Sequence, residues 1–218
     1  MTINTILFDL DGLLIESEKA HFAALEDLLS KYGKETPAEW FQPMIGMDND
    51  ESASFIIKET GLPFSINELN DIRFDHIINL LPQITEPKDG LMDLMQTCQQ
   101  LNLKMGVASN SPPKYVHAAL HALNIHDKFG VIRTAYDVPE GKPAPDVFLE
   151  AARQLNAVPA ESIGVEDSLL GLQAVIAAGM TSVAVPNQYL SAANFRDADH
   201  VFTSLAEFNK HLPELINH

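Results

Sequence analysis

The sequence predicts an α/β fold in which a doubly wound parallel sheet is interrupted by an inserted, all-helical module. Two patterns lead to this prediction. From Lys88 onward, short apolar runs alternate with helical patterns, and such alternation favours parallel strands joined by right-handed crossovers. Residues 16–85, in contrast, have helical patterns and no convincing strand. We therefore expect an α/β core of residues 1–15 and 86–218 and a helical module of residues 16–85.

The helical module is expected to contain helices with apolar residues at helical spacing. They cover residues 17–32, 48–61 and 65–81. Gly33 ends the first helix, because glycine accepts the left-handed conformation that closes many helices. Pro82 begins the segment that breaks the last pattern. Trp40, in the connection after the first helix, is expected to anchor the core of this module rather than to bind a ligand.

The α/β core is expected to contain a strand wherever a short apolar run is followed by polar or turn residues. These runs cover residues 6–8, 103–108, 131–133, 162–165, 181–185 and 200–202. Helical patterns cover residues 91–98, 112–123, 145–155 and 169–178, and a short helix starts at Leu205. Cys98 is the only cysteine, so an internal disulfide is excluded, and its helical surroundings indicate burial.

Composition and charge narrow the classes of function. The chain is 46% hydrophobic and 20% charged, which is typical of a folded soluble protein. A net charge of −16 without any Lys/Arg-rich run argues against a general nucleic-acid binder. Asp9 interrupts the first apolar run, and no run approaches the length of a membrane span. We therefore expect a cytoplasmic protein that binds neither nucleic acid nor membrane; the sequence leaves its oligomeric state open.

The first expected strand ends in the segment Asp9-Leu10-Asp11-Gly12. Ligands of open α/β sheets sit at the carboxyl ends of the strands. Two carboxylates so close together repel each other unless a cation or a shared proton lies between them, and Mg²⁺ prefers oxygen ligands. The same pattern also occurs in turns and helix caps, so it indicates catalysis only together with the other strand ends.

Three further segments carry candidate site residues. Ser109 ends a strand and offers a hydroxyl and forward-pointing amides to a phosphate, although a serine there can also cap a helix. Lys142 lies between a glycine and a proline, and this rigid setting favours a role in neutralising charge over that of a solvated loop lysine. Glu166 and Asp167 follow another apolar strand, where neighbouring acids bind a cation or, in the case of Asp167, cap a helix.

In this order and spacing, these segments resemble the four motifs of the haloacid dehalogenase superfamily, namely Asp9-Leu10-Asp11-Gly12, Ser109, Lys142 and Glu166-Asp167. The stretches at residues 9–18 and 141–146 are similar to the branch that contains β-phosphoglucomutase and sugar-phosphate phosphatases. The resemblance covers the whole chain, and it implies a Rossmann-like core with an inserted helical cap.

The resemblance implies an Mg²⁺-dependent phosphatase that acts on small phosphorylated metabolites, such as sugar phosphates. Asp9 would attack phosphorus and form an aspartyl-phosphate. Asp11 would protonate the leaving oxygen and later take a proton from water. Asp9, the backbone carbonyl of Asp11 and Asp167 would bind Mg²⁺, with Glu166 as an indirect partner or an additional ligand.

The same resemblance assigns phosphate binding to Ser109, the amide of Asn110 and Lys142, which could also steady Asp9. The haloalkanoate dehalogenases of this superfamily lack an acid at the place of Asp11, because a halide leaves without a proton. The acid present here therefore favours phosphate esters as substrates.

The cap would close over the site and contact the leaving group. Candidate contacts are His21, which matches a histidine of the related sugar-phosphate enzymes, Asn49 and Arg73. Each also has a structural explanation: a packed helix face, a helix start and a solvated cation, respectively. His117 and His121 have the spacing of metal ligands on a helix, but an exposed pair is the preferred interpretation.

Two alternative functions stay open at this point. One is a phosphosugar mutase of the β-phosphoglucomutase type, and the other is a non-catalytic module that binds phosphorylated metabolites. β-Phosphoglucomutase uses an arginine of a cap loop to grip the second phosphate of its bisphosphate intermediate. Asn49 occupies the corresponding place here, between Asp48 and Asp50, which favours a phosphatase.

Overall fold

The computed structural model describes residues 2–45 and 47–216; Met1, Gly46, Asn217 and His218 lie outside the described residues. The chain forms two compact units. The α/β unit comprises Met1–Glu16 and Glu86–His218, and the helical unit comprises Ser17–Thr85. The first boundary thus lies one residue after the one expected from the sequence.

The described part of the α/β unit contains one parallel sheet of six strands in the order β3-β2-β1-β4-β5-β6. The strands are β1 (Thr5–Phe8), β2 (Lys104–Ser109), β3 (Val131–Thr134), β4 (Ser162–Glu166), β5 (Thr181–Ala184) and β6 (His200–Val201). The chain winds outward from β1 in both directions, and ligands of such sheets bind where the strand order reverses. That point lies between β1 and β4, so the predicted fold class is confirmed.

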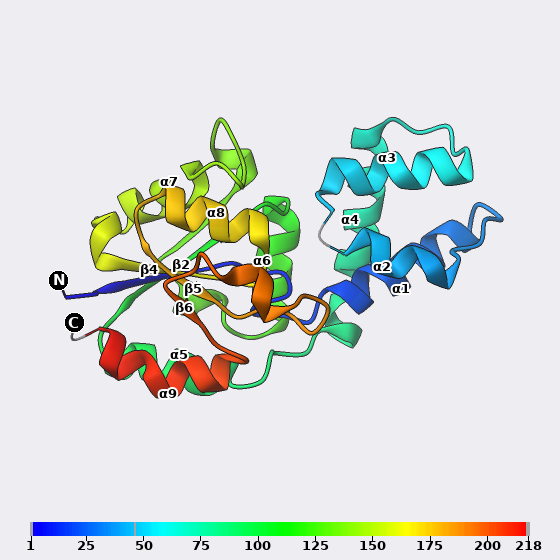
Figure 1. Cartoon of the computed structure of the whole chain (residues 1–218). Helices are drawn as coiled ribbons and strands as arrows, with labels where there is room; N and C mark the ends of the chain where they lie inside the picture. Colours follow the sequence, from blue (N-terminus) through cyan, green and yellow to red (C-terminus); the bar gives the residue numbers. More distant parts are fainter. Residues whose placement is uncertain (1, 46, 217–218) are drawn as a thin grey trace. The chain divides into compact units, whose positions relative to one another are not determined.

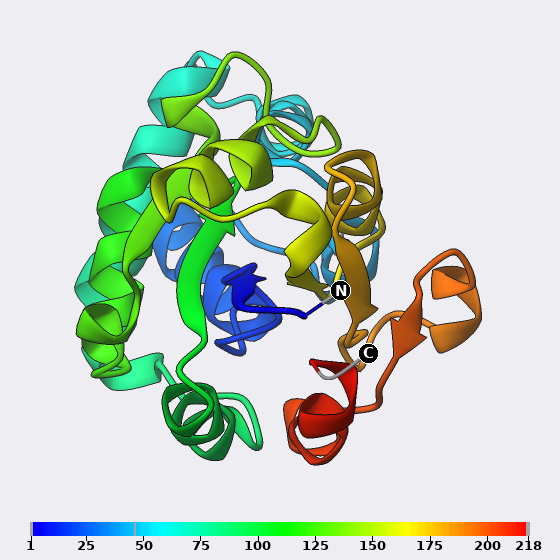
Figure 2. The ribbon, with the colours of Figure 1, turned by 90° about the vertical axis from the view of Figure 1, so that its left-hand side faces the viewer.

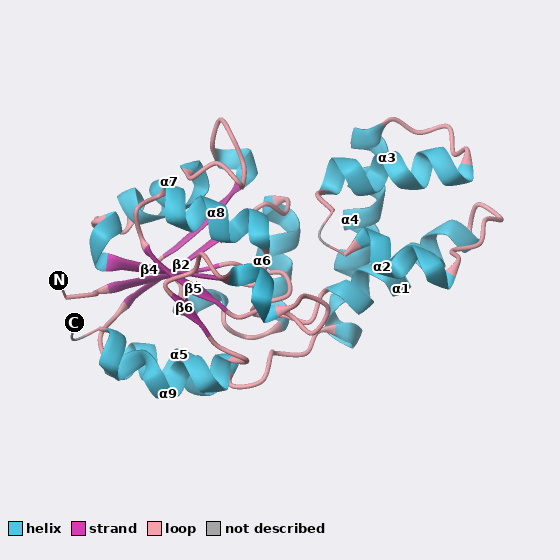
Figure 3. Cartoon of the chain, viewed as in Figure 1, coloured by secondary structure: helices cyan, strands magenta, loops and turns pink. Residues whose placement is uncertain are grey.

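Helices cover both faces of this sheet (Figure 1, Figure 2). They are α5 (Leu91–Gln100), α6 (Pro113–Ala122), α7 (Asp146–Gln154), α8 (Leu169–Ala177) and α9 (Leu205–Leu215). Short 3₁₀ turns cover His126–Lys128, Ala135–Asp137, Pro159–Glu161 and Ala192–Phe195. Helices α7 and α8 lie on one face and pack on the strands, whereas α5 and α9 pack together on the other face (Figure 3).

The core of the α/β unit lies between the sheet and helices α7 and α8. Apolar residues of β1, β2 and β3 meet those of the two helices in one buried cluster, which includes Leu7, Ala108, Val131, Phe148, Ala151 and Val175. Cys98 is fully buried in α5, and burial raises the pKa of its thiol to about 12. The thiol is therefore protonated at neutral pH, and the predicted packing role of this cysteine is confirmed.

The helical unit contains α1 (Glu18–Ser30), a 3₁₀ turn (Ala38–Trp40), α2 (Phe41–Met44), α3 (Asn49–Thr60) and α4 (Ile66–Ile84). Asp48 and Ser65 cap α3 and α4 through reciprocal bonds with Glu51 and Glu68, respectively, which fixes both helix starts. Among the described residues, no helix has both the length and the apolar composition needed to cross a membrane.

The helical unit differs from the prediction in two places. The connection after α1 contains the 3₁₀ turn and α2, neither of which was predicted. Trp40 of this connection packs against the buried core of the unit, as predicted, and its ring lies edge-on to Phe55 with the centroids 5.3 Å apart. Pro82 lies inside the last turn of α4 rather than ending it. The proline lacks a backbone donor, but the hydrogen bonding of the last turn continues past it, since the Thr85 amide donates to the Leu81 carbonyl at 3.0 Å.

Candidate active site

The predicted site residues of the α/β unit meet at the carboxyl ends of β1, β2 and β4. Phe8 lies opposite Val107 in β2 and Val165 in β4, so the segments after these strands leave the sheet at the same edge. Asp9 follows β1 directly, and its amide donates to the Val165 carbonyl at 3.0 Å. Ser109 and Glu166 are the last residues of β2 and β4.

Lys142 lies at the centre of this edge and is buried. Its ammonium group donates to the Asp9 carboxylate and, at 2.6 Å, to Oε1 of Glu166, and it lies 5.0 Å from the centroid of the Phe148 ring. Burial alone would lower the pKa of Lys142, but the carboxylates of Asp9 and Glu166 outweigh this effect and raise it. The lysine therefore carries a fixed positive charge toward Asp9.

The ionisation of Asp9 depends on its buried setting. Burial and, to a smaller extent, the carboxylates of Glu166 and Asp11 together raise the pKa of Asp9 to about 8, despite the lowering effect of Lys142. A cation beside Asp9 would lower this pKa, because positive charge stabilises the ionised carboxyl. The ionised form of Asp9 would thus be favoured by an additional positive charge in the site.

Three acids of this edge have the spacing of metal ligands. Carboxylate oxygens of Asp9, Glu166 and Asp167 lie within 4.8 Å of one another, and no other group of this kind occurs in residues 2–45 and 47–216. All three residues are buried, and Glu166 also accepts bonds from Lys142 and from Ser168 Oγ at 3.1 Å. A set of anionic oxygen donors around one point fits a hard cation such as Mg²⁺.

Asn187 orients one of these acids, and the sequence patterns gave no sign of it. Its side-chain amide donates to Oδ2 of Asp167 at 2.9 Å, and its own oxygen accepts the Tyr189 amide at 3.0 Å. Asn187 is buried, so these bonds hold the Asp167 carboxylate in one orientation. Such partners of a metal-binding carboxylate fix its geometry.

Asn110 holds Lys142 in place through its side chain. Its Oδ1 accepts the Lys142 amide at 2.8 Å, and its Nδ2 donates to the Lys142 carbonyl at 3.1 Å. A side chain at Gly141 would approach Oδ1 of Asn110 to 2.8 Å, which explains the glycine there. Ser109 Oγ accepts the Ser111 amide at 3.0 Å, so part of the predicted phosphate loop bonds within itself. The sequence had suggested only a backbone role for Asn110.

Asp11 lies half-buried beside Asp9 and has two hydroxyl partners from the segment after β2. Ser111 Oγ donates to its Oδ2 and the Tyr115 hydroxyl donates to its Oδ1, both at 2.7 Å. The sequence prediction missed Ser111 and Tyr115, because an apolar helix pattern that contains a tyrosine indicates a packing residue rather than a partner of a carboxylate.

Gly171 in the first turn of α8 leaves room for Glu166. A Cβ atom at this position would lie 1.9 Å from the Glu166 carboxylate, which is fully buried and bonded to Lys142. We expect Gly171→Ala to lower the free energy of unfolding by about 2–4 kcal/mol, because separating a buried ion pair costs more than alanine's helix propensity returns. Urea unfolding measures this change.

The control for this prediction is the same substitution in a Glu166→Ala background. With the glutamate removed, Gly171→Ala should be neutral or stabilising by up to about 1 kcal/mol, as for an ordinary helix position. A loss of stability of the same size in both backgrounds would show that the clash is not with Glu166.

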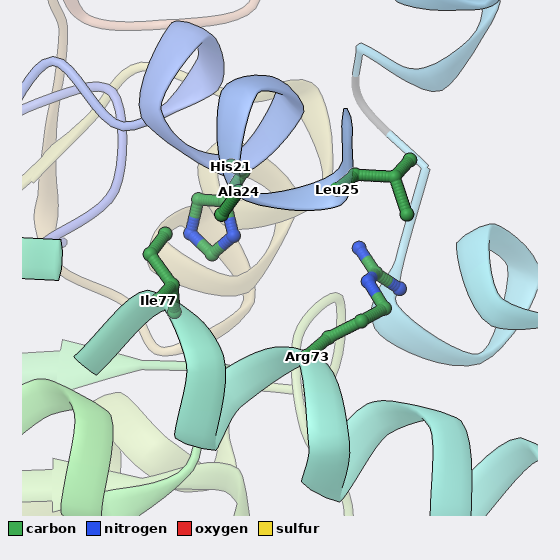
Figure 4. A pocket seen from close by; sticks show the side chains of 5 residues that line it. All are labelled: His21, Ala24, Leu25, Arg73 and Ile77. Carbon is green, nitrogen blue, oxygen red and sulfur yellow. The ribbon is translucent and has the colours of Figure 1, made fainter. Parts of the chain in front are cut away.

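Two of the three candidate residues of the helical unit lie together. His21 and Arg73 line a small pocket between α1 and α4 with Ala24, Leu25 and Ile77 (Figure 4). The Arg73 side chain extends from α4 toward α1 (Figure 4). Burial lowers the pKa of its guanidinium group to about 10. Among the described residues, no carboxylate forms an ion pair with Arg73. Asn49 begins α3 and is not among the lining residues.

The histidines of α6 form an exposed group, as expected. His117 and His121 are both exposed. His117 Nδ1 lies 2.9 Å from Nε2 of His126, and the rings of His121 and His126 stack with centroids 3.9 Å apart. These ring contacts explain why His117, His121 and His126 lie together.

The chain matches the family model described as "Haloacid dehalogenase-like hydrolase" over residues 6–185. It is 30% identical over 219 residues to (DL)-glycerol-3-phosphatase 2 of Arabidopsis thaliana, with 95% of this chain and 89% of the relative covered. It is also similar to the crystal structure of CbbY from Rhodobacter sphaeroides in complex with phosphate, at a TM-score of 0.85 and 26% identity, covering 94% of this chain and 96% of CbbY.

A further similar structure is β-phosphoglucomutase from Clostridium difficile. The TM-score is 0.78 and the identity is 26%, with 99% of this chain and 97% of that chain covered. The similar proteins thus include one named as a phosphatase and one named as a phosphoglucomutase.

Proposed function

Because this chain belongs to the haloacid dehalogenase-like hydrolase family, we propose that this phosphatase hydrolyses small phosphorylated metabolites, such as sugar phosphates, with Mg²⁺ and through an aspartyl-phosphate. The observation that carries the proposal is the buried contact between Asp9 and Lys142, beside the acids Glu166 and Asp167. A relative named as a glycerol-3-phosphatase supports the class of substrate.

Asp9 is the proposed nucleophile. Its carboxylate oxygen attacks phosphorus, the bond to the leaving oxygen breaks, and Asp11 gives that oxygen a proton. Water then attacks the aspartyl-phosphate and passes a proton to Asp11, which releases inorganic phosphate and restores both acids. Asp11 is well suited to both steps because it lies beside Asp9 on the loop that follows β1.

Lys142, Ser109 and the amide of Asn110 are proposed to bind the phosphoryl oxygens. Lys142 supplies a fixed positive charge in a buried site, where it acts strongly on charge that develops during phosphoryl transfer. Mg²⁺, held by Asp9, Asp167 and the backbone carbonyl of Asp11, would offset the repulsion between carboxylate and phosphate. Glu166 is a further candidate ligand because it shares the acid cluster.

The helical unit is proposed to act as the cap that selects the leaving group, and the α/β unit as the catalytic core. His21 and Arg73 support this role because they line one pocket, and Arg73 offers it a cation. Asn49 remains a proposed substrate contact from the start of α3.

Phosphatase action is favoured over mutase action by the charges around Asn49. Asparagine can bond to a sugar hydroxyl but cannot neutralise a second phosphate, and Asp48 and Asp50 add negative charge beside it. Losing a charge-assisted contact costs about 1.5–3 kcal/mol, so a bisphosphate would be held more weakly. Water would then react with the aspartyl-phosphate first. The likeness to β-phosphoglucomutase keeps the mutase as the second candidate.

The deciding experiment supplies β-glucose 1-phosphate with Mg²⁺ and a trace of glucose 1,6-bisphosphate. We expect inorganic phosphate as the product, measured against Asp9→Asn as the inactive control. Efficient formation of glucose 6-phosphate would instead establish the mutase. Hydrolysis of p-nitrophenyl phosphate in a parallel assay tests catalysis itself, and its absence would favour the non-catalytic binding module.

A further inference from the structure

Two hydroxyl groups hold the Asp11 carboxylate, one on each oxygen. Ser111 Oγ donates to Oδ2 at 2.7 Å, and the Tyr115 hydroxyl donates to Oδ1 at 2.7 Å. Hydrogen bonds to a carboxylate have this length when they are strong. Because each bond ends on a different oxygen, the pair fixes both the position of the carboxylate and its rotation.

The two donors are themselves held rigidly. Tyr115 lies in the first turn of α6 and is fully buried, so its ring cannot turn away from Asp11. Pro112 and Pro113 open this helix with restricted backbone angles. Ser111 is buried, and its amide donates to Ser109 Oγ at 3.0 Å, which ties it to the end of β2. The donors are therefore positioned before any substrate binds.

We propose that Tyr115 and Ser111 are positioning residues that aim Asp11 for proton transfer. This inference rests on the proposed function, in which Asp11 serves the leaving oxygen and then the attacking water. A carboxyl group transfers a proton directly only within about 2.6–3.2 Å of its partner, so loss of orientation slows the step. Each oxygen of a carboxylate has two lone pairs, so the hydroxyl bonds leave room for the transferred proton.

A purely structural role for the two hydroxyls makes a different prediction. If Tyr115 and Ser111 only stabilised the fold, their removal would lower the rate for every substrate by the same factor. If they aim Asp11, the loss should grow with the basicity of the leaving group, because poor leaving groups need the proton most. The dependence on leaving group therefore separates the two roles.

The experiment measures kcat/KM for substituted phenyl phosphates of similar shape whose phenols differ in acidity. This ratio reports the steps up to release of the phenol and so excludes hydrolysis of the aspartyl-phosphate. Tyr115→Phe should change kcat/KM for p-nitrophenyl phosphate by no more than about twofold and lower kcat/KM for unsubstituted phenyl phosphate about tenfold. This tenfold loss is a part of the roughly 10²–10⁴-fold contribution that an acid catalyst makes. A plot of log kcat/KM against the pKa of the phenol should therefore be steeper for Tyr115→Phe than for the wild type, with a slope closer to that of Asp11→Asn.

Matched variants complete the test. Tyr32→Phe makes the same chemical change at an exposed residue of the helical unit and should not alter the plot. Ser111→Ala should make the plot steeper, as Tyr115→Phe does. If Tyr115→Phe fails to fold, Ser111→Ala provides the test instead. If the wild type is active and the plots for the Tyr115 and Ser111 variants run parallel to the wild-type plot, the positioning role is wrong while the proposed function stands. Wild type that hydrolyses none of the phenyl phosphates would overturn the proposed function as well.

Discussion

Replacing Asp9 with asparagine is expected to abolish turnover while the protein stays folded. The amide of asparagine has nearly the volume of the carboxylate but cannot attack phosphorus. Removal of a catalytic nucleophile lowers the rate by about 10⁴-fold or more, and we expect a loss of this size. The substitution removes one negative charge from the group formed with Glu166 and Asp167, but it also removes one partner of the buried Lys142 ammonium, which keeps Glu166 as its other partner. These effects on the free energy of unfolding oppose each other, so we expect the variant to stay folded.

The measurement is p-nitrophenol release at saturating Mg²⁺, with urea unfolding to show that the variant is folded. Asp127→Asn is a matched control, because its side chain is fully exposed and lies outside the acid cluster. Fluoroberyllate with Mg²⁺ should inhibit the wild type by imitating the aspartyl-phosphate. Normal turnover by Asp9→Asn would exclude Asp9 as the nucleophile.

Lys142→Ala and Asp167→Ala are expected to fail in different ways. Asp167 is a proposed metal ligand, so its loss should raise the Mg²⁺ concentration needed for half-maximal activity and leave much of the activity at saturation. Lys142 is proposed to contribute positive charge to the phosphoryl site, so its loss should lower kcat by about 10²–10³-fold at any Mg²⁺ concentration. Titrations of activity with Mg²⁺ distinguish the two patterns.

Stability is part of this test, because Lys142 is buried between Asp9 and Glu166. Removing one partner of a buried ion pair costs about 3–5 kcal/mol, so activity must be expressed per folded protein. Lys58→Ala is the matched control, since that side chain is 81% exposed. If excess Mg²⁺ rescued both variants equally, the separate roles assigned to Lys142 and Asp167 would be wrong.

The sheet and its acidic edge were predictable because both follow from local patterns. An apolar run that ends in Asp9 or Glu166 specifies a buried strand and the end at which a ligand sits. Parallel winding then brings such ends together without any knowledge of distant contacts. The helix caps at Asp48 and Ser65 are equally local, since each involves a glutamate three residues later.

The residues that orient the site were not predictable, because their meaning depends on contacts far along the chain. Tyr115 contacts a carboxylate 104 positions earlier, and Asn110 contacts a lysine 32 positions later. Gly171 looks like a weak helix residue until the Glu166 side chain is placed beside it. Pro82 looks like a helix end, although one missing donor in a last turn is tolerated.

In the acid cluster, binding of the proposed metal ion would compete with binding of a proton. Asp9, Glu166 and Asp167 would together carry more negative charge than Lys142 offsets if all three were ionised, and burial above all raises the pKa of Asp9 to about 8. Below that pH, Asp9 of the metal-free protein holds a proton that an entering cation must displace. Loading of the proposed Mg²⁺ would therefore release a proton, and its apparent affinity would rise with pH until Asp9 is ionised in the metal-free protein. With Mg²⁺ as the proposed cofactor, a fall in pH would then lower activity in the same way as a fall in the concentration of free Mg²⁺.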